Sequence, residues 1–210
     1  MGVRGLAPAL FLRLGKDQEC YDFLKWYHTT GKSPTHDWGD TDLGFLDIKD
    51  ADIFKPVDLY TGEYSDTSHA AAVTLIKIRQ LLDAKALDNA TILGEKIPME
   101  IINNIRGNLV SSIIAKNKDI MLSTDRGPFM KKLEDQIKRL YEAVNVTNKF
   151  FWPALINPGS DLGAPPETYS HGSQQHMRLI PNYNYASWDE TPGAIDLIKE
   201  MVAKNYAQVH

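Results

Sequence analysis

Apolar residues recur three or four positions apart in several stretches of this chain, and this spacing constrains the fold more than any other feature of the sequence. Residues with that separation lie on one face of an α-helix, where they can be buried together. One such set is Ile101, Ile102, Ile105, Leu109, Ile113 and Ile114, and another is Leu133, Ile137, Leu140 and Val144. The alternation of apolar and polar residues that marks a half-buried strand is convincing nowhere. The sequence therefore predicts an all-α fold, built as an irregular bundle of helical hairpins.

Glycine, proline and capping residues set the expected ends of the helices. Gly15 follows the first apolar stripe, and glycine most easily takes the left-handed conformation at which helices end. Asp17 is expected to cap the next helix, while Pro98 and Pro128 suit the first turn of two others. The expected helices cover residues 3–15, 17–31, 67–87, 98–114, 128–144, 173–187 and 191–202, and Trp152, before Pro153, is an alternative end of the fifth.

A long acidic segment separates the second and third expected helices. From Asp37 to Asp66 the chain has nine acidic residues against two lysines, a charge of −7, whereas the formal net charge of the whole chain is only −4. Prolines and glycines punctuate residues 32–68, which predicts a long ordered loop with at most single helical turns. We expect residues 1–210 to form one helical domain that this acidic insertion interrupts.

The residues around the first expected turn carry a resemblance to a known family. Residues 11–23, Phe-Leu-Arg-Leu-Gly-Lys-Asp-Gln-Glu-Cys-Tyr-Asp-Phe, resemble the turn region of a tetratricopeptide repeat, and the match covers about one repeat. In that family a glycine closes the first helix and a small residue five positions later lets the second helix pack closely. Gly15 and Cys20 fill those places here. The resemblance implies a helical-repeat fold that serves protein–protein interaction.

More loosely, and over much of its length, the chain is similar to uncharacterised fungal proteins in which such helices accompany a MYND-type zinc finger. The finger is absent here, because the single cysteine, Cys20, cannot form a cysteine-rich tetrahedral zinc site. Pro8 stands where the tetratricopeptide motif prefers a small helical residue, and no second clean copy of the motif follows. A regular tandem array is therefore not expected.

Composition and charge argue against several classes of function. A net charge of −4 does not suit a nucleic-acid binder, which needs a basic face to neutralise phosphates. No stretch approaches the roughly 20 apolar residues of a membrane-spanning helix. The N-terminus lacks the basic flank and long apolar region of a secretory signal. We therefore expect a cytoplasmic protein, with the nucleus as the alternative, and neither a membrane partner nor a cofactor.

The candidate binding residues lie in the acidic segment. They are His36, Asp37, Trp38, Asp40, Asp42, Asp47, Asp50 and Asp52. Imidazole and carboxylate groups can hold a divalent metal that activates water, so a metal-dependent hydrolase using His36, Asp37 and Asp40, with His69 as a further candidate, is one alternative. The spacing matches no established metal motif, and turns also select aspartate and glycine. No residue is therefore assigned as catalytic or as a metal ligand.

Other reactive side chains have structural interpretations. His171 and His176 are five positions apart, which does not place them on one helix face. His28 is expected to pack at the end of its helix or to act there as a partial cation, and Cys20 to be a small buried packing residue.

A series of aromatic residues near the C-terminus has two interpretations. Its rings can line a groove for a peptide or small ligand, or they can join successive hairpins. The residues are Phe150, Phe151, Trp152, Tyr183, Tyr185 and Trp188.

These observations favour a non-enzymatic interaction module, which holds a partner segment in a groove between hairpins or pairs with itself. The acidic segment would steer a basic peptide toward the protein in a salt-sensitive manner. The expected partner is therefore a protein or basic peptide. The hydrolase and a binder of small ligands or carbohydrates remain the alternatives.

Overall fold

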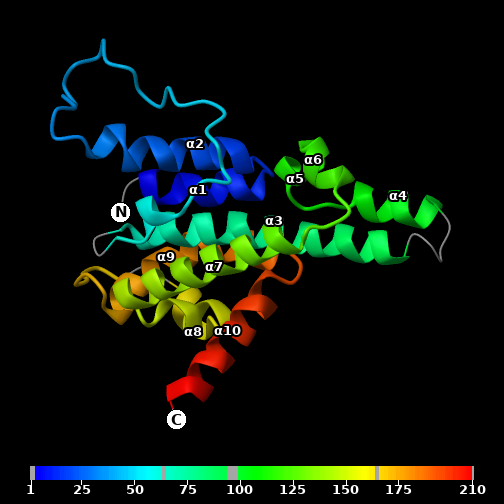
Figure 1. Cartoon of the computed structure of the whole chain (residues 1–210). Helices are drawn as coiled ribbons and strands as arrows, with labels where there is room; N and C mark the ends of the chain where they lie inside the picture. The colour runs from blue at the N-terminus through cyan, green and yellow to red at the C-terminus, as the bar shows by residue number, and fades with distance from the viewer. Residues whose placement is uncertain (1–2, 63–64, 94–98, 164–165, 210) are drawn as a thin grey trace.

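Figure 1 shows the computed structural model of the chain. It describes residues 3–62, 65–93, 99–163 and 166–209, apart from the side chains of residues 93, 99, 101–102, 160–161, 181–183 and 205–209. The α-helices are α1 (Val3–Arg13), α2 (Asp17–His28), α3 (Thr67–Leu93), α4 (Met99–Gly107), α5 (Ser112–Lys116), α6 (Lys118–Leu122), α7 (Gly127–Thr147), α8 (Phe151–Ile156), α9 (Gln174–Asp189) and α10 (Ala194–Val209). The 3-10 helices are η1 (Thr30–Lys32), η2 (Asp58–Tyr60) and η3 (Gly159–Leu162).

Every regular element in the described part of the chain is a helix, and no strand occurs there. The prediction of an all-α fold is therefore confirmed. Within the same residues, none of the helices combines the length and the apolar character needed to cross a membrane.

The long helix α3 is the centre of the bundle. It packs against α1, α2, α7 and α9, and α1 and α9 also pack against each other (Figure 1). Because these helices surround it, nearly every residue from Thr67 to Ala84 is buried. The run Ala70, Ala71 and Ala72 lies within this part and allows neighbouring helices to approach closely. The helix also extends to Leu93, beyond its expected end.

The helices α1 and α2 form a hairpin at the position that the sequence predicts. Gly15 adopts a φ of +68° in the turn, the left-handed conformation expected of it. Cys20 is fully buried, and its Sγ lies 3.5 Å from the carbonyl oxygen of Pro8, so it is a packing residue. The relationship of this hairpin to tetratricopeptide repeats stays a prediction.

Asp17 does not cap α2, contrary to expectation. The N-cap residue is Lys16, whose side chain makes no capping bond, and Asp17 is the buried first residue of the helix. Its Oδ1 accepts a hydrogen bond from Nη1 of Arg79 on α3 at 2.7 Å. Arg79 also donates to the carbonyl of Leu12 and the hydroxyl of Thr191. One guanidinium therefore joins α1, α2, α3 and the turn before α10.

The helix expected over residues 98–114 is interrupted. Helix α4 ends at Gly107, and α5 begins only at Ser112. Between them the N–H groups of Val110 and Ser111 donate to the carboxylate of Asp83 on α3, at 2.8 and 2.5 Å. Burial raises the pKa of Asp83 to about 6, although these two bonds favour its ionised form. The expected start of the helix at Pro98 lies outside the described residues.

Pro128 lies in the first turn of α7, as predicted. The helix includes the predicted residues through Val144 and ends at Thr147, so the alternative end at Trp152 is wrong. The side chain of Asn148 redirects the chain, because its Oδ1 accepts from the N–H of Phe150 and its Nδ2 donates to the carbonyl of Ser173. A separate helix, α8, follows this turn.

The segment between η1 and η2, residues 33–57, consists of turns and bends. Its second half is tied to the bundle. Asp22 on α2 accepts hydrogen bonds from the N–H groups of Asp50 and Ala51, and Nζ of Lys77 donates to the carbonyl of Ile53 at 2.6 Å. Burial lowers the pKa of Lys77 to about 8. The first half of the segment is mostly exposed.

Candidate functional site

Aromatic rings gather where α2 meets the acidic segment. Trp26 is fully buried at their centre, and the ring centroids of His36, Trp38 and Phe45 lie 5.3, 5.8 and 4.9 Å from its own. Tyr27 stacks on Trp38 with 21° between the ring planes. Trp38 and Phe45 nevertheless remain 58% and 57% exposed. Both rings are therefore anchored on one side and open to solvent on the other.

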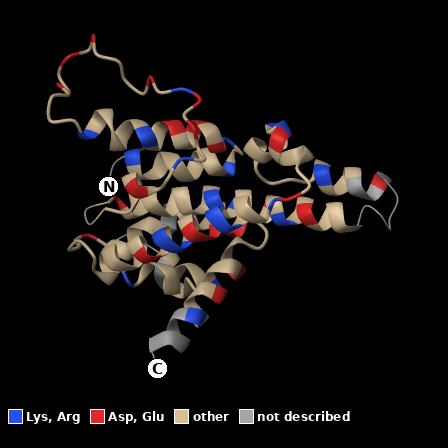
Figure 2. Ribbon diagram, viewed as in Figure 1, with Lys and Arg blue, Asp and Glu red and all other residues tan. Residues whose placement is uncertain are grey.

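Carboxylates surround these two rings. Between Lys32 and Lys49 the chain has four aspartates and no lysine or arginine, and Figure 2 shows acidic residues spread along this loop. We define the acidic–aromatic surface as Trp38 and Phe45 together with Asp37, Asp40, Asp42 and Asp47. All six side chains are exposed.

Several of the candidate aspartates also shape the loop. Oδ1 of Asp37 accepts from the N–H of Gly39 at 2.8 Å, and Oδ1 of Asp40 accepts from the N–H of Asp42 at 2.9 Å. Asp52 bonds the N–H of Phe54 in the same manner. These are the local turns for which aspartate is selected. The turn interpretation of the sequence is therefore correct for these residues.

The residues named for a hydrolase do not assemble into a metal centre. His36 packs against Trp26 and Trp38, whereas His69 lies on α3 and bonds to His28. Across the described residues, no three histidine, cysteine, aspartate or glutamate side chains are placed to hold one metal ion. The geometry gives the hydrolase alternative no support.

Four of the six histidines line a cavity that sequence reasoning missed. This histidine cavity has a volume of about 360 Å³ and lies between the start of α1, the end of α2, the start of α3 and residues 169–176. His28, His69, His171 and His176 line it. The other charged and aromatic lining residues are Arg4, Tyr27, Lys32, Asp66 and Tyr169.

His171 and His176 lie close together, although they do not share a helix face. Their ring centroids are 4.8 Å apart. Only His176 belongs to α9, and Gly172, with a φ of +77°, turns the chain before the helix begins. The two rings meet without a common helix face, because His171 precedes the helix.

His28 and His69 form a hydrogen-bonded pair beside this cavity. Nε2 of His28 lies 3.1 Å from Nδ1 of His69, and Nε2 of His69 lies 3.2 Å from the carbonyl oxygen of Arg4. A carbonyl only accepts, so the neutral pair carries a proton on Nε2 of each ring. Burial lowers the pKa of both, and that of His28 falls to about 3. His28 therefore packs as a neutral ring, and the expected partial cation at the end of α2 is wrong.

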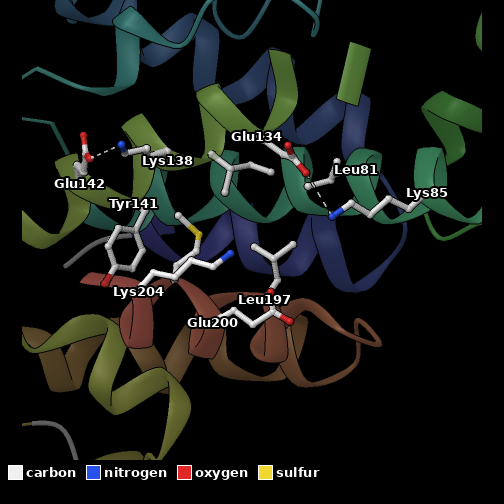
Figure 3. Close-up of a pocket in the computed structure, with 11 residues that line it drawn as sticks. Leu81, Lys85, Glu134, Lys138, Tyr141, Glu142, Leu197, Glu200 and Lys204 are labelled. Carbon is white, nitrogen blue, oxygen red and sulfur yellow. Dashed lines mark ion pairs between the residues drawn. The ribbon is translucent and has the colours of Figure 1, made fainter. Parts of the chain in front are cut away.

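A groove separates α10 from α3 and α7 (Figure 3). Its volume is about 340 Å³. Apolar atoms of Leu81, Ile137, Tyr141, Leu197 and Met201 line it, together with the charged residues Lys85, Glu134, Lys138, Glu142, Glu200 and Lys204. Lys85 pairs with Glu134 at 3.3 Å, and Lys138 pairs with Glu142 at 3.9 Å.

The C-terminal aromatic series mainly joins helices. Phe151, Trp152 and Trp188 are buried, and the Trp152 ring stacks on Tyr141 with centroids 5.2 Å apart. Trp152 also meets the edge of Trp188, which links α7, α8 and α9. The packing interpretation is therefore correct for these rings, while the side chain of Tyr183 lies outside the described residues.

No protein-family model matches this chain, and the searches found neither a curated protein nor a solved structure similar to it. Its function is therefore inferred from the surfaces described above.

Proposed function

We propose that this protein is a non-enzymatic interaction module that binds a basic peptide segment of a partner at the acidic–aromatic surface. The observation that carries the proposal is the exposure of Trp38 and Phe45, each more than half exposed, among four carboxylates. Aromatic residues are enriched where proteins bind one another, and they often dominate the binding energy. The negative charge around them selects a cationic segment.

Lysine and arginine side chains can make two kinds of contact here. A cation over the face of Trp38 contributes about 0.5–1 kcal/mol at an exposed site. Carboxylates add charge-assisted hydrogen bonds. Asp37 and Asp40 use Oδ1 in their own turns, and Oδ2 of each has no partner in the part of the chain described. Because these charges are exposed, salt screens them, and the affinity should fall as salt rises.

The test titrates a fluorescently labelled short peptide, rich in lysine and arginine, with the full chain. The fluorescence anisotropy of the peptide measures binding. We expect saturable binding that Trp38→Ala/Phe45→Ala weakens about tenfold or more, because both anchoring rings are lost.

The matched control is Leu122→Ala/Val146→Ala, which removes two apolar side chains that are 77% and 78% exposed elsewhere. This variant should bind like the unmodified chain. Equal weakening by the two double variants would contradict the proposal, and so would equally tight binding of an acidic peptide.

The groove beside α10 supports a second candidate site for the same class of function. An apolar floor with charged edges suits an amphipathic helix, whose apolar face enters the groove. Met201 is partly buried in this floor. We expect Met201→Glu to abolish binding of an amphipathic helical peptide while basic-peptide binding is unchanged. A helical peptide that binds the variant as well as the unmodified chain would eliminate this site.

A further inference from the structure

Two cationic side chains at the histidine cavity have no ion-pair partner among the described residues. Arg4 and Lys32 both line the cavity, and both are exposed. Neither forms an ion pair with any residue that the structure describes. The guanidinium of Arg4 instead lies over the ring of Tyr27, 5.6 Å from its centroid. Arg4 and Lys32 therefore bring two positive charges to the cavity, whose described lining contains one carboxylate, that of Asp66.

Asp66 lines the same cavity, but its carboxylate is already engaged. Its Oδ1 accepts hydrogen bonds from the N–H and the hydroxyl of Ser68, at 2.9 and 2.6 Å. Asp66 thus caps the N-terminus of α3, where the helix dipole stabilises a negative charge. The helix stabilises this charge without removing it, so one carboxylate faces the two cationic side chains, Arg4 and Lys32.

One wall of the cavity is aromatic. The ring of Tyr169 stacks on that of His176 with centroids 5.3 Å apart and 13° between the planes, and His171 lies beside them. Tyr169 is 46% exposed, so part of this wall is available to a ligand. Planar rings stack favourably on such walls. The neutral His28 and His69 add no charge on the other side.

We propose that the histidine cavity binds a small aromatic phosphate ester, with the phosphate between Arg4 and Lys32 and the aromatic ring against Tyr169. Guanidinium groups bind phosphate through two parallel hydrogen bonds, and an ammonium group adds a compact charge. The volume of about 360 Å³ falls within the usual range for small-molecule sites. This site is independent of the acidic–aromatic surface, which has the opposite charge.

The experiment titrates the full chain with phenyl phosphate and, separately, with inorganic phosphate and with phenol, while the histidine ring signals are followed by NMR. Phenyl phosphate should bind saturably and shift the signals of His171 and His176 but not that of His36. Inorganic phosphate and phenol should each bind more weakly. No saturable binding of phenyl phosphate would overturn the proposal, and inorganic phosphate that binds equally tightly would overturn the aromatic part of it.

Two pairs of substitutions locate the site. Arg4→Gln/Lys32→Gln removes both charges at exposed positions and keeps the Arg4 backbone carbonyl that His69 contacts, so we expect an intact fold. The affinity for phenyl phosphate should fall about tenfold or more. The control is Arg106→Gln/Lys118→Gln, on α4 and α6 at the far end of the molecule (Figure 1), which should change it less than about twofold. Equal effects of the two variants would place binding elsewhere and refute the assignment.

Tyr169→Ala tests the aromatic wall separately. This variant should weaken the binding of phenyl phosphate while the binding of inorganic phosphate is unchanged. An unchanged affinity for phenyl phosphate would show that the ring does not stack on Tyr169 and would overturn that part of the proposal.

Discussion

Asp17 and Arg79 form a buried ion pair between α2 and α3, with Nη1 and Oδ1 2.7 Å apart and side chains that are 0% and 5% exposed. The same guanidinium donates to Leu12 and Thr191. Removing two charges from water is costly, so the net contribution of such a pair is small. Removal of one partner, by contrast, leaves the other charge buried and unpaired.

We therefore predict that Asp17→Ala lowers the free energy of unfolding by about 3–5 kcal/mol. The exposed pair of Arg13 and Glu190, at 2.6 Å, provides the control, because Arg13→Gln should cost less than about 1 kcal/mol. Urea unfolding of both variants measures the difference. Similar losses of stability would show that removing one partner of the buried Asp17–Arg79 pair costs no more than removing one partner of an exposed pair.

The histidine pair predicts how stability depends on pH. Burial and the proximity of His69 lower the pKa of folded His28 to about 3, from the ordinary histidine value of 6.5. The unfolded chain therefore binds more protons between these values, so the contribution of neutral His28 is complete above pH about 6.5 and is lost as the pH falls. The loss at pH about 5 is on the order of 2 kcal/mol.

Urea unfolding at neutral pH and at pH about 5 measures this dependence. We expect His28→Asn to reduce the slope of stability against pH. The control, His36→Asn, alters a partly exposed ring in the aromatic cluster and should keep the slope of the unmodified chain. An unchanged slope in His28→Asn would assign the acid sensitivity to other groups.

Substitution by alanine should change the stability differently at Gly15, which follows α1, and at Gly107, which is the last residue of α4. Gly15 has a φ of +68°, so Gly15→Ala should cost about 1–2 kcal/mol although nothing lies within 4 Å of the added Cβ. Gly107 ends α4 in equally open space without a positive φ, and Gly107→Ala should be neutral or stabilise by up to about 1 kcal/mol. Thermal unfolding compares them, and a stabilising Gly15→Ala would contradict the assigned turn.

Neutralising the loop should weaken peptide binding without loosening the loop. Asp37→Asn/Asp40→Asn removes two charges, but the asparagine side-chain oxygen can still accept the N–H bonds of the turns. We expect a lower affinity for the basic peptide, a weaker salt dependence and unchanged stability. If the affinity and its salt dependence both stay constant, charge at these positions does not attract the peptide.

The helices were largely predictable because their signals are local. Apolar spacing located α7, while Gly15 and Pro128 marked helix ends through their own backbone preferences. The errors arose where a distant side chain decides the outcome. Asp83 holds the break between α4 and α5, and Asn148 ends α7 by contacting residue 173. Spacing along the sequence contains no information on such contacts.

The candidate sites were likewise predictable only where the signal is local in the sequence. The sequence located the acidic segment and Trp38, since charge and composition are visible there. It did not reveal that Trp26 anchors the exposed rings from α2. The histidine cavity was missed entirely, because His28, His69 and His176 belong to three different helices that only the fold brings together.

The most direct test of basic-peptide binding at the acidic–aromatic surface is an NMR titration that follows the indole N–H signals of the four tryptophans. Trp38 is exposed, whereas Trp26, Trp152 and Trp188 are buried. A lysine- and arginine-rich peptide at low salt should shift the Trp38 signal saturably and that of the adjacent Trp26 less, and leave Trp152 and Trp188 unchanged. Added salt should reverse these shifts. A Trp38 signal that stays fixed while the peptide saturates the protein would contradict the account.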